Sequence, residues 1–138
     1  MTGRLPGLVL ASLLAGGSAA AQGATPPDSL ALCRQYAQWF FTGQMDSVLA
    51  HTAPDARADQ TKDVLLQRLE QMTMRGGTEV EVLEEKFVKR NGRTQYWRTS
   101  KFSDFEEPLL FRWALDPQLQ IIGMGMGPKS QAPPIDPS

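Results

Sequence analysis

The first half of the chain carries apolar residues at the spacing of an α-helix. Prolines and an acid suit a first turn near Asp28, and Gly43 is a favourable left-handed cap at the other end. The apolar residues between them lie on one broad arc: Leu30, Leu32, Cys33, Tyr36, Ala37, Trp39, Phe40 and Phe41. This arc is wider than a helix packed on one surface needs. We therefore expect the helix to be covered on two sides, by a sheet and by another helix.

Two further helices are predicted before the middle of the chain. A short one covers Gln44–His51 and is stopped by Ala53-Pro54. The next covers Thr61–Met74, where Leu65, Leu69 and Met72 recur at i, i+4 and i+7. The pair Gly76-Gly77 ends it.

The chain after this glycine pair has the pattern of β-strands. Asn91-Gly92 is the strongest short signal for a hairpin, and Asp116-Pro117-Gln118 is typical of a second turn. These turns divide four predicted strands: Thr78–Arg90, Arg93–Phe105, Leu109–Leu115 and Leu119–Met124.

The hairpin turn also predicts which side chains face each other. With Asn91-Gly92 at the tip, Phe87 lies opposite Tyr96, and Glu85 lies opposite Arg98 on the same face. If that face turned inward, Glu85 and Arg98 would form a polar patch in an aromatic pocket. We expect instead an outward-facing surface pair.

The apolar positions of the first strand change parity near Leu83-Glu84, which predicts a β-bulge that bends the strand. A bent sheet curls around a helix. The sequence therefore predicts an α+β fold in which three N-terminal helices pack on a curved antiparallel four-stranded sheet, a cone-shaped roll.

This order of elements resembles the nuclear transport factor 2-like superfamily over about residues 28–128. Within it the chain is most similar to the bacterial domain-of-unknown-function family 3887, found in exported proteins, alone or beside hydrolase domains. The matching stretches are WFFTGQMDSV at 39–48, Gly76-Gly77, and LDPQLQIIGM at 115–124. The resemblance implies the cone fold. Enzymes of the superfamily typically use an Asp or an Asp/His pair inside the cone, whereas His51 here falls at a helix end.

The two ends of the chain differ from its middle. Residues 1–21 have the charge, apolar run and small residues of a secretory signal peptide, with cleavage predicted after Ala21. The apolar run is too short for a membrane anchor, and we expect a secreted or periplasmic protein. Residues 22–27 are predicted to be a linker, residues 28–128 the folded domain, and residues 129–138 a disordered Pro-rich tail.

Length, charge and cysteine content exclude several classes of protein. A chain of 138 residues has room for one domain, which excludes a multidomain enzyme. The net charge of −1 lacks the basic excess that nucleic-acid binding requires. The single cysteine, Cys33, allows no intramolecular disulfide. Its apolar surroundings favour a buried structural residue over a reactive or dimer-forming thiol.

The titratable residues form no complete catalytic or metal-binding set. His51, Asp46 and Asp55 share no rigid face across the Pro54 break, so a solvated loop histidine is expected. The adjacent acids Glu84-Glu85 and Glu106-Glu107 would point to opposite faces of a strand.

The methionines offer one further reading. Met72, Met74, Met124 and Met126, with Cys33, would suit copper(I). The glycines that alternate with Met124 and Met126 favour a close backbone approach instead. No metal and no cofactor is predicted.

The excess of aromatic residues without a catalytic set favours a non-enzymatic binding module. We expect it to take a small apolar or amphipathic molecule, or a protein partner, at the cone. The predicted ligand-binding residues are Tyr36, Phe40, Phe87, Tyr96, Arg98 and Trp113. The alternative is an isomerase- or dehydratase-like enzyme with an inward carboxylate such as Glu85 or Asp104. A homodimer that covers an exposed sheet face is a third hypothesis.

Overall fold

The computed structural model describes residues 26–137 of the chain. Residues 26–31 and residues 32–137 belong to different units of the chain. Of the first unit, only the opening turns of helix α2 are described. The predicted signal peptide and its cleavage site lie outside the described residues, as does most of the predicted linker.

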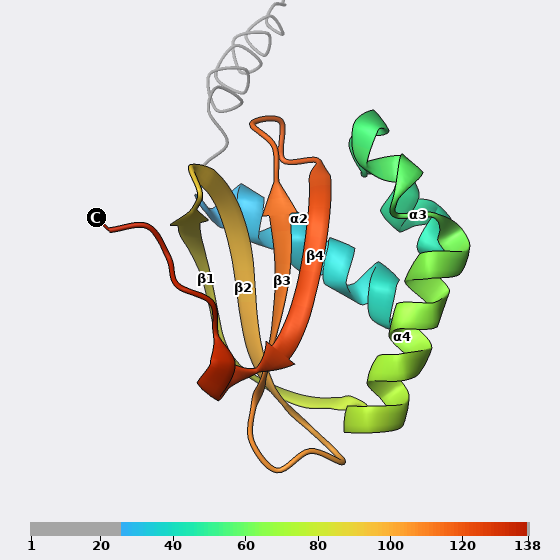
Figure 1. Ribbon diagram of the computed structural model, residues 1–138, viewed down its shortest axis with the longest axis vertical. Helices are drawn as coiled ribbons and strands as arrows, with labels where there is room; N and C mark the ends of the chain where they lie inside the picture. Colours follow the sequence, from blue (N-terminus) through green and yellow to red (C-terminus); the bar gives the residue numbers. More distant parts are fainter. Residues whose placement is uncertain (1–25, 138) are drawn as a thin grey trace, which may run out of the picture. The chain divides into compact units, whose positions relative to one another are not determined.

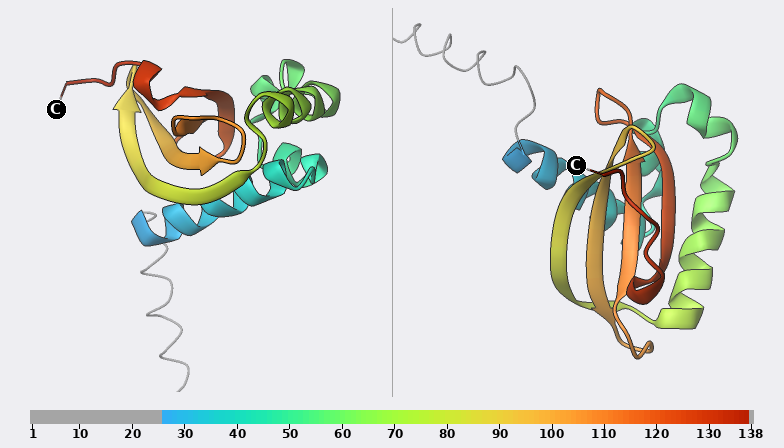
Figure 2. Two further views of the ribbon diagram at one scale, coloured as in Figure 1. Left: turned by 90° about the horizontal axis from the view of Figure 1, so that it is seen from below. Right: turned by 60° about the vertical axis from the view of Figure 1, so that its left-hand side comes forward.

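The described elements confirm the predicted fold class. Three α-helices precede a four-stranded antiparallel sheet with strand order β1-β2-β3-β4, which is curved and not closed (Figures 1 and 2). The helices are α2 (Pro26–Phe41), α3 (Met45–Ala50) and α4 (Lys62–Gly76), with a 3-10 turn η2 (Pro54–Ala58) before α4. The strands are β1 (Glu79–Arg90), β2 (Arg93–Phe102), β3 (Leu109–Leu115) and β4 (Ile121–Pro128), followed by a 3-10 turn η3 (Lys129–Gln131).

Local signals position the ends of α4. The Thr61 side chain accepts a hydrogen bond from the backbone N–H of Val64, which satisfies one of the unpaired donors of the first turn. At the other end Gly77 has φ of 81° and ψ of −137°, a conformation open almost only to glycine. The chain thereby turns from α4 directly into β1.

The hairpin of β1 and β2 has the predicted register. Asn91 and Gly92 both have positive φ, at 56° and 76°, as a tight two-residue turn requires. Glu85 pairs with Arg98, and Phe87 pairs with Tyr96. The bulge predicted at residues 83–84 is confirmed, because the register shifts between residues 82 and 84. A second shift, between residues 79 and 81, was not expected.

Four strand boundaries differ from the prediction: β1 begins one residue later, at Glu79, β2 ends at Phe102, and β4 begins at Ile121 and continues to Pro128. Hydrogen bonds explain the end of β2 and the start of β4. β2 ends at Phe102 because the next two N–H groups bond to the α4–β1 junction instead: Ser103 donates to Thr78 O, and Asp104 to Gly76 O. β4 begins at Ile121 because the Asp116 side chain accepts from the N–H groups of residues 118 and 120. The turn therefore occupies residues 116–120.

The core lies between α2 and the sheet. Trp113 of β3 meets Tyr36 and Phe40 of α2 edge to face, with ring centroids 6.2 and 6.0 Å apart. The large side chains with less than 2% exposure are Trp113, Tyr36, Tyr96, Phe40, Phe111, Met45, Leu65, Leu110, Leu115, Ile121 and Val48. Cys33 is also fully buried, as predicted, and burial raises the pKa of its thiol to about 12.

The segment after α3 pairs with the edge of β4, which the sequence did not predict. Thr52 forms a parallel bridge with Ile121. Ile121 donates its N–H to His51 O at 2.8 Å, and Ala53 donates to Ile121 O at 2.9 Å. Pro54 was predicted to stop the preceding helix. In the structure it follows this bridge, and because a proline has no N–H to donate, the pairing with β4 ends there.

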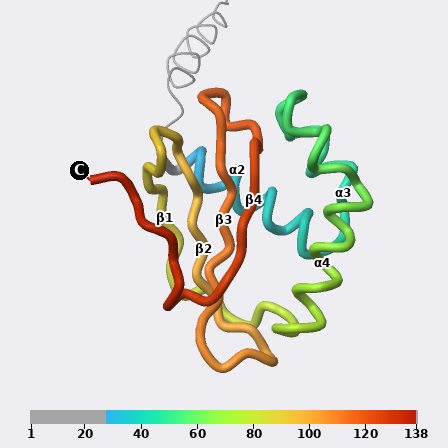
Figure 3. The backbone as a smooth tube through the Cα atoms, in the orientation of Figure 1, coloured from blue at the N-terminus to red at the C-terminus, as the bar shows by residue number. Residues whose placement is uncertain are grey.

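The segment after β4 was predicted to be disordered, and it follows a defined path in the structure. It returns from β4 along the sheet to the tip of the β1–β2 hairpin, on the side away from α2 (Figures 2 and 3). The Asp136 carboxylate accepts hydrogen bonds from the N–H groups of Asn91 and Gly92, each at 2.8 Å. The N–H of Asp136 bonds to Lys89 O.

The backbone at Gly77 allows a test of this architecture. A Cβ there would lie 2.1 Å from Ser103 Oγ, in a conformation that L side chains rarely adopt. We expect Gly77→Ala to lower the free energy of unfolding by about 3 kcal/mol or more, because strain and a clash add.

Gly43 supplies the matched control. It also has a positive φ, of 77°, but a Cβ there meets nothing within 4 Å. Gly43→Ala is expected to cost about 1 kcal/mol. Urea denaturation of both variants measures the difference, and equal losses would contradict the tight α4–β1 junction.

Candidate functional site

The six predicted ligand-binding residues form two separate groups. Tyr36, Phe40 and Trp113 pack together in the core and are at most 1% exposed. The Trp113 Nε1 is buried and has no hydrogen-bond partner among residues 26–137. Tyr96 is also fully buried, beside the half-buried Phe87, with ring centroids 5.9 Å apart. These aromatic residues therefore build the fold, and Phe40 also lines the groove described below.

Arg98, the sixth predicted residue, belongs to a charged network between α2, β1 and β2. Its side chain is 13% exposed and that of Glu85 is 12% exposed, so the expectation of an outward-facing surface pair was wrong. The register of the hairpin, unbroken from the Asn91-Gly92 turn to Glu84, sets Glu85 on the same face as Tyr96 and Arg98, toward α2. There Arg34 of α2 reaches the carboxylate with Nε at 2.9 Å and Nη2 at 2.7 Å.

The remaining polar atoms of the network are also paired. Glu85 accepts further hydrogen bonds from the Tyr96 hydroxyl and from Arg98 Nη1. Arg98 donates to both carboxylate oxygens of Glu79, at 2.8 and 2.7 Å. Ser100 donates to Glu79 at 2.6 Å. Two carboxylates thus balance two guanidinium groups.

This pairing decides the ionisation of the two acids. Burial alone would raise the pKa of each carboxyl group. For Glu85, hydrogen bonds from Arg34 and Tyr96 and the charges of Arg34 and Arg98 outweigh the effect of burial. For Glu79, hydrogen bonds from Arg98 and Ser100 and the charge of Arg98 do so. Both pKa values are therefore lowered. Burial and the bond to Glu85 raise the pKa of Tyr96.

A cleft of about 400 Å³ lies over this network. Its lining residues are Arg34, Gln38, Phe41, Thr42, Glu79, Val82, Glu85 and Arg98. Glu85 is ionised and held by several donors there, whereas a general base needs a free lone pair and a pKa near the working pH. Asp104, the other carboxylate considered for an enzyme, is exposed in the β2–β3 loop.

His51 is half-buried rather than solvated. Its ring packs 5.0 Å from that of Trp39 and 5.4 Å from that of Tyr36, and its Nδ1 lies 3.1 Å from Ser47 O. Asp46 pairs with Lys62 instead, at 3.3 Å. Within residues 26–137 no group of three or more His, Cys, Asp or Glu side chains is placed to hold a metal ion.

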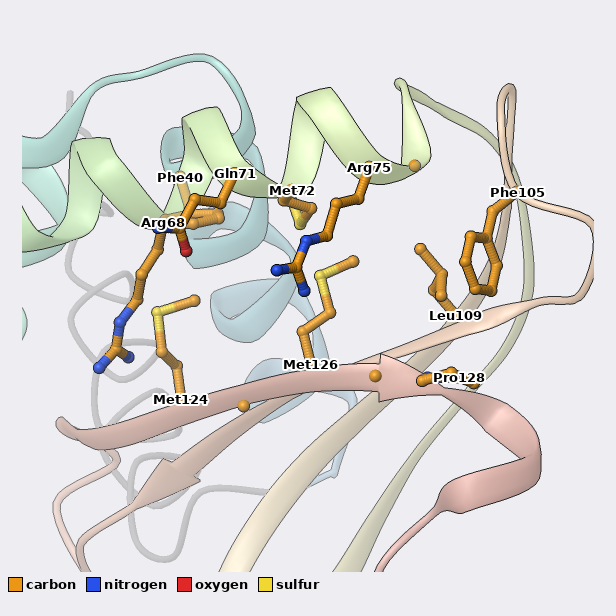
Figure 4. A pocket seen from close by; sticks show the side chains of 13 residues that line it. Phe40, Arg68, Gln71, Met72, Arg75, Phe105, Leu109, Met124, Met126 and Pro128 are labelled. Atoms are coloured by element: carbon orange, nitrogen blue, oxygen red, sulfur yellow. The ribbon is translucent and has the colours of Figure 1, made fainter.

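A larger groove lies between α4 and β4, with a volume of about 500 Å³. Figure 4 shows the side chains that line it. They come from α4 (Arg68, Gln71, Met72, Arg75 and Gly76), from β4 (Met124, Gly125, Met126, Gly127 and Pro128), and from Phe40, Phe105 and Leu109. Apolar side chains and glycines make up most of the wall.

The periodicities of the two elements place these residues. In β4, Met124 and Met126 alternate with glycines, so both methionines point to the side of α4. In α4, residues 68, 71, 72 and 75 have the i, i+3, i+4, i+7 spacing of a single helix face. Arg68 and Arg75 extend from that face toward β4 (Figure 4), and no acid is among the lining residues.

The sequence did not predict this groove. The Met-Gly alternation was considered only for copper(I) binding and for a close backbone approach, and Arg68 and Arg75 were not singled out. The methionines of β4 and the arginines of α4 line the same groove, which exists only because α4 lies beside β4 (Figure 4). Chemically the groove offers polarisable apolar walls and two guanidinium groups, which suit a molecule with an apolar body and an anionic end.

The charged network predicts a pH dependence of stability. Because the pKa values of Glu79 and Glu85 are lower in the folded protein than in the unfolded chain, the network stabilises the fold above the ordinary glutamate pKa of about 4.3. This stabilisation is lost as the pH falls below that value. Urea denaturation between about pH 3 and pH 7 measures it.

Glu85→Gln should lower the free energy of unfolding at pH 7 by about 2–4 kcal/mol, because Arg98 loses a partner in a partly buried site. It should also flatten the acid dependence. Glu81→Gln is the control, because Glu81 is exposed and its ion pair with Lys101 is long, at 3.9 Å, and therefore weak. This substitution should cost less than about 0.5 kcal/mol. Equal losses in both variants would contradict the role of the network.

None of the helices in residues 26–137 has the length and apolar character needed to cross a membrane. Comparison of the chain with protein-family models, curated proteins and solved structures found no match. The likeness to the nuclear transport factor 2-like superfamily and to family 3887 therefore stays a prediction.

Proposed function

We propose that this protein is a non-enzymatic binding module that takes a small amphipathic anion into the groove between α4 and β4. The observation that carries the proposal is the groove's lining: three methionines, two arginines and no acid. The apolar part of the ligand would lie against Met72, Met124 and Met126. Its anionic end would meet Arg68 or Arg75.

The dimensions of the groove support a small ligand. Its volume of about 500 Å³ lies within the range of about 300–1,000 Å³ typical of small-molecule pockets. Methionine side chains adapt to different ligand shapes, because they are unbranched and polarisable. We expect the protein to prefer a class of ligand, an apolar chain with one negative charge, over a single rigid compound.

The enzyme alternative finds less support. An isomerase or dehydratase needs a carboxylate that is free to accept a proton at the base of a cavity. Glu85 is engaged by Arg34, Tyr96 and Arg98, and Asp104 is exposed.

We also keep secretion as a proposal, based on the predicted signal peptide in residues 1–21.

Octanoate and octylammonium test the ligand class, because they share one apolar tail and carry opposite charges. Isothermal titration of the full chain should show that octanoate binds and octylammonium does not. Burial of the tail should give a negative change in heat capacity. Equal binding of the two compounds would contradict a role for the arginines, and binding of neither would reject the proposed function.

Two methionine variants locate the site. Met126→Gln keeps the length of the side chain but makes the groove wall polar, and it should weaken octanoate binding about tenfold. Met74→Gln is the matched control, because Met74 lies on α4 but is 78% exposed and outside the groove lining. Octanoate should bind this control as tightly as the unaltered protein. If both variants lost affinity equally, the ligand would bind elsewhere.

A further inference from the structure

The sheet has a second functional candidate on its other face, the one away from α2. The register places Lys86, Trp97, Arg112 and Gly125 in one row across the four strands. Directly paired residues share a face, and alternation along β1 puts Arg90 on this face as well. None of these residues lines the α4–β4 groove except Gly125.

Two half-buried arginines on this face lack partners. Among residues 26–137, no acid lies within salt-bridge distance of Arg90 or Arg112, and neither side chain makes a hydrogen bond. The Nε of Arg90 is shielded from solvent and finds no acceptor in the part of the chain that the structure describes. Burial and the charge of Arg90 both lower the pKa of Arg112. Two like charges that are partly desolvated and unpaired cost free energy.

Gly125 leaves room for the Arg112 side chain, and the nearest charged groups do not neutralise it. A Cβ on Gly125 would lie 2.2 Å from Arg112 Nη2, so the missing side chain at residue 125 leaves the space that the guanidinium occupies. Trp97, the neighbour of Arg112 on β2, is flanked by the ammonium groups of Lys86 and Lys129, 5.9 and 5.7 Å from its ring. This part of the face is therefore cationic.

The nearby acids are already engaged. Glu84 lies 3.9 Å from Lys86 and 3.6 Å from Lys129. The Asp136 carboxylate accepts from two turn amides, which lower its pKa, with a smaller contribution from Arg90. Neither acid reaches the two guanidinium groups. The groups left without partners at Arg90 and Arg112 are therefore N–H donors, and a negatively charged acceptor would satisfy them.

We propose that Arg90 and Arg112 form a binding site for a small oxyanion of the phosphate or carboxylate type. Guanidinium groups bind such oxygens through paired, charge-assisted hydrogen bonds. An anion between the two arginines would remove their mutual repulsion and supply the missing acceptor. The site lies on different residues from the α4–β4 groove and does not depend on the function proposed for it.

Thermal unfolding of the full chain tests the site with inorganic phosphate as the probe. Phosphate should raise Tm by about 4–8 °C at roughly tenfold above Kd, relative to sodium chloride of equal ionic strength. A parallel titration with acetate separates the two oxyanion types: a rise with phosphate alone indicates a phosphate site, and a rise with acetate a carboxylate site. No rise with either would overturn the proposal.

Substitutions connect the effect to the two arginines. Arg112→Gln and Arg90→Gln should each abolish the oxyanion-dependent rise. In chloride Arg112→Gln should keep or raise Tm, because a repelling charge is gone. Arg112→Lys should bind more weakly than the unaltered protein, because a lysine cannot form the paired bonds.

Lys101→Gln is the control for general surface charge. Lys101 lies on the same strand as Trp97, is 61% exposed and makes only a weak pair with Glu81. This variant should retain the full response. If it lost the response as Arg112→Gln does, or if Arg112→Gln retained it, the oxyanion would bind by general electrostatics and the proposed site would be wrong.

Discussion

The ion pairs around Glu85 join the parts of this fold. The carboxylate receives donors from α2, through Arg34, and from β2, through Tyr96 and Arg98. A charge at 12% exposure is tolerated only when it is paired, so these three elements are held in one relative arrangement. The hairpin turn makes this pairing possible, since the unbroken register from Asn91-Gly92 sets Glu85 opposite Arg98, and a slip of one residue would turn Glu85 to the other face of the sheet.

The strand β4 serves two faces with two residue types. Its methionines face α4 and form one wall of the groove, while the glycine at 125 leaves space for the guanidinium of Arg112 on the opposite face. A Cβ at residue 125 would lie 2.2 Å from that guanidinium, whereas a Cβ at residue 127 would meet nothing within 4 Å. One short alternating sequence thus makes both candidate sites possible, although they differ in chemistry.

Much of the fold could be predicted because its signals are local. Asn91-Gly92 set the hairpin register, and Gly76-Gly77 marked the change from helix to strand. The bridge between Thr52 and Ile121 joins residues far apart in sequence, so no local pattern could predict it. The predicted site residues had the right type for a pocket, but aromatic residues fill a core as readily as they line a cavity. Arg68 and Arg75 become candidate binding residues only because β4 lies beside them and completes the groove.

The segment after β4 shows why a proline-rich composition does not by itself mean disorder. Pro128 at the end of β4 and the prolines at 133, 134 and 137 restrict the backbone before any contact forms, so this segment has less conformational entropy to lose when it is ordered. A few anchors can then hold it: Lys129 beside Trp97 at one end and Asp136 on the hairpin turn at the other. The stiffness that prevents this segment from packing into a core lets it act as a preorganised strap across the sheet.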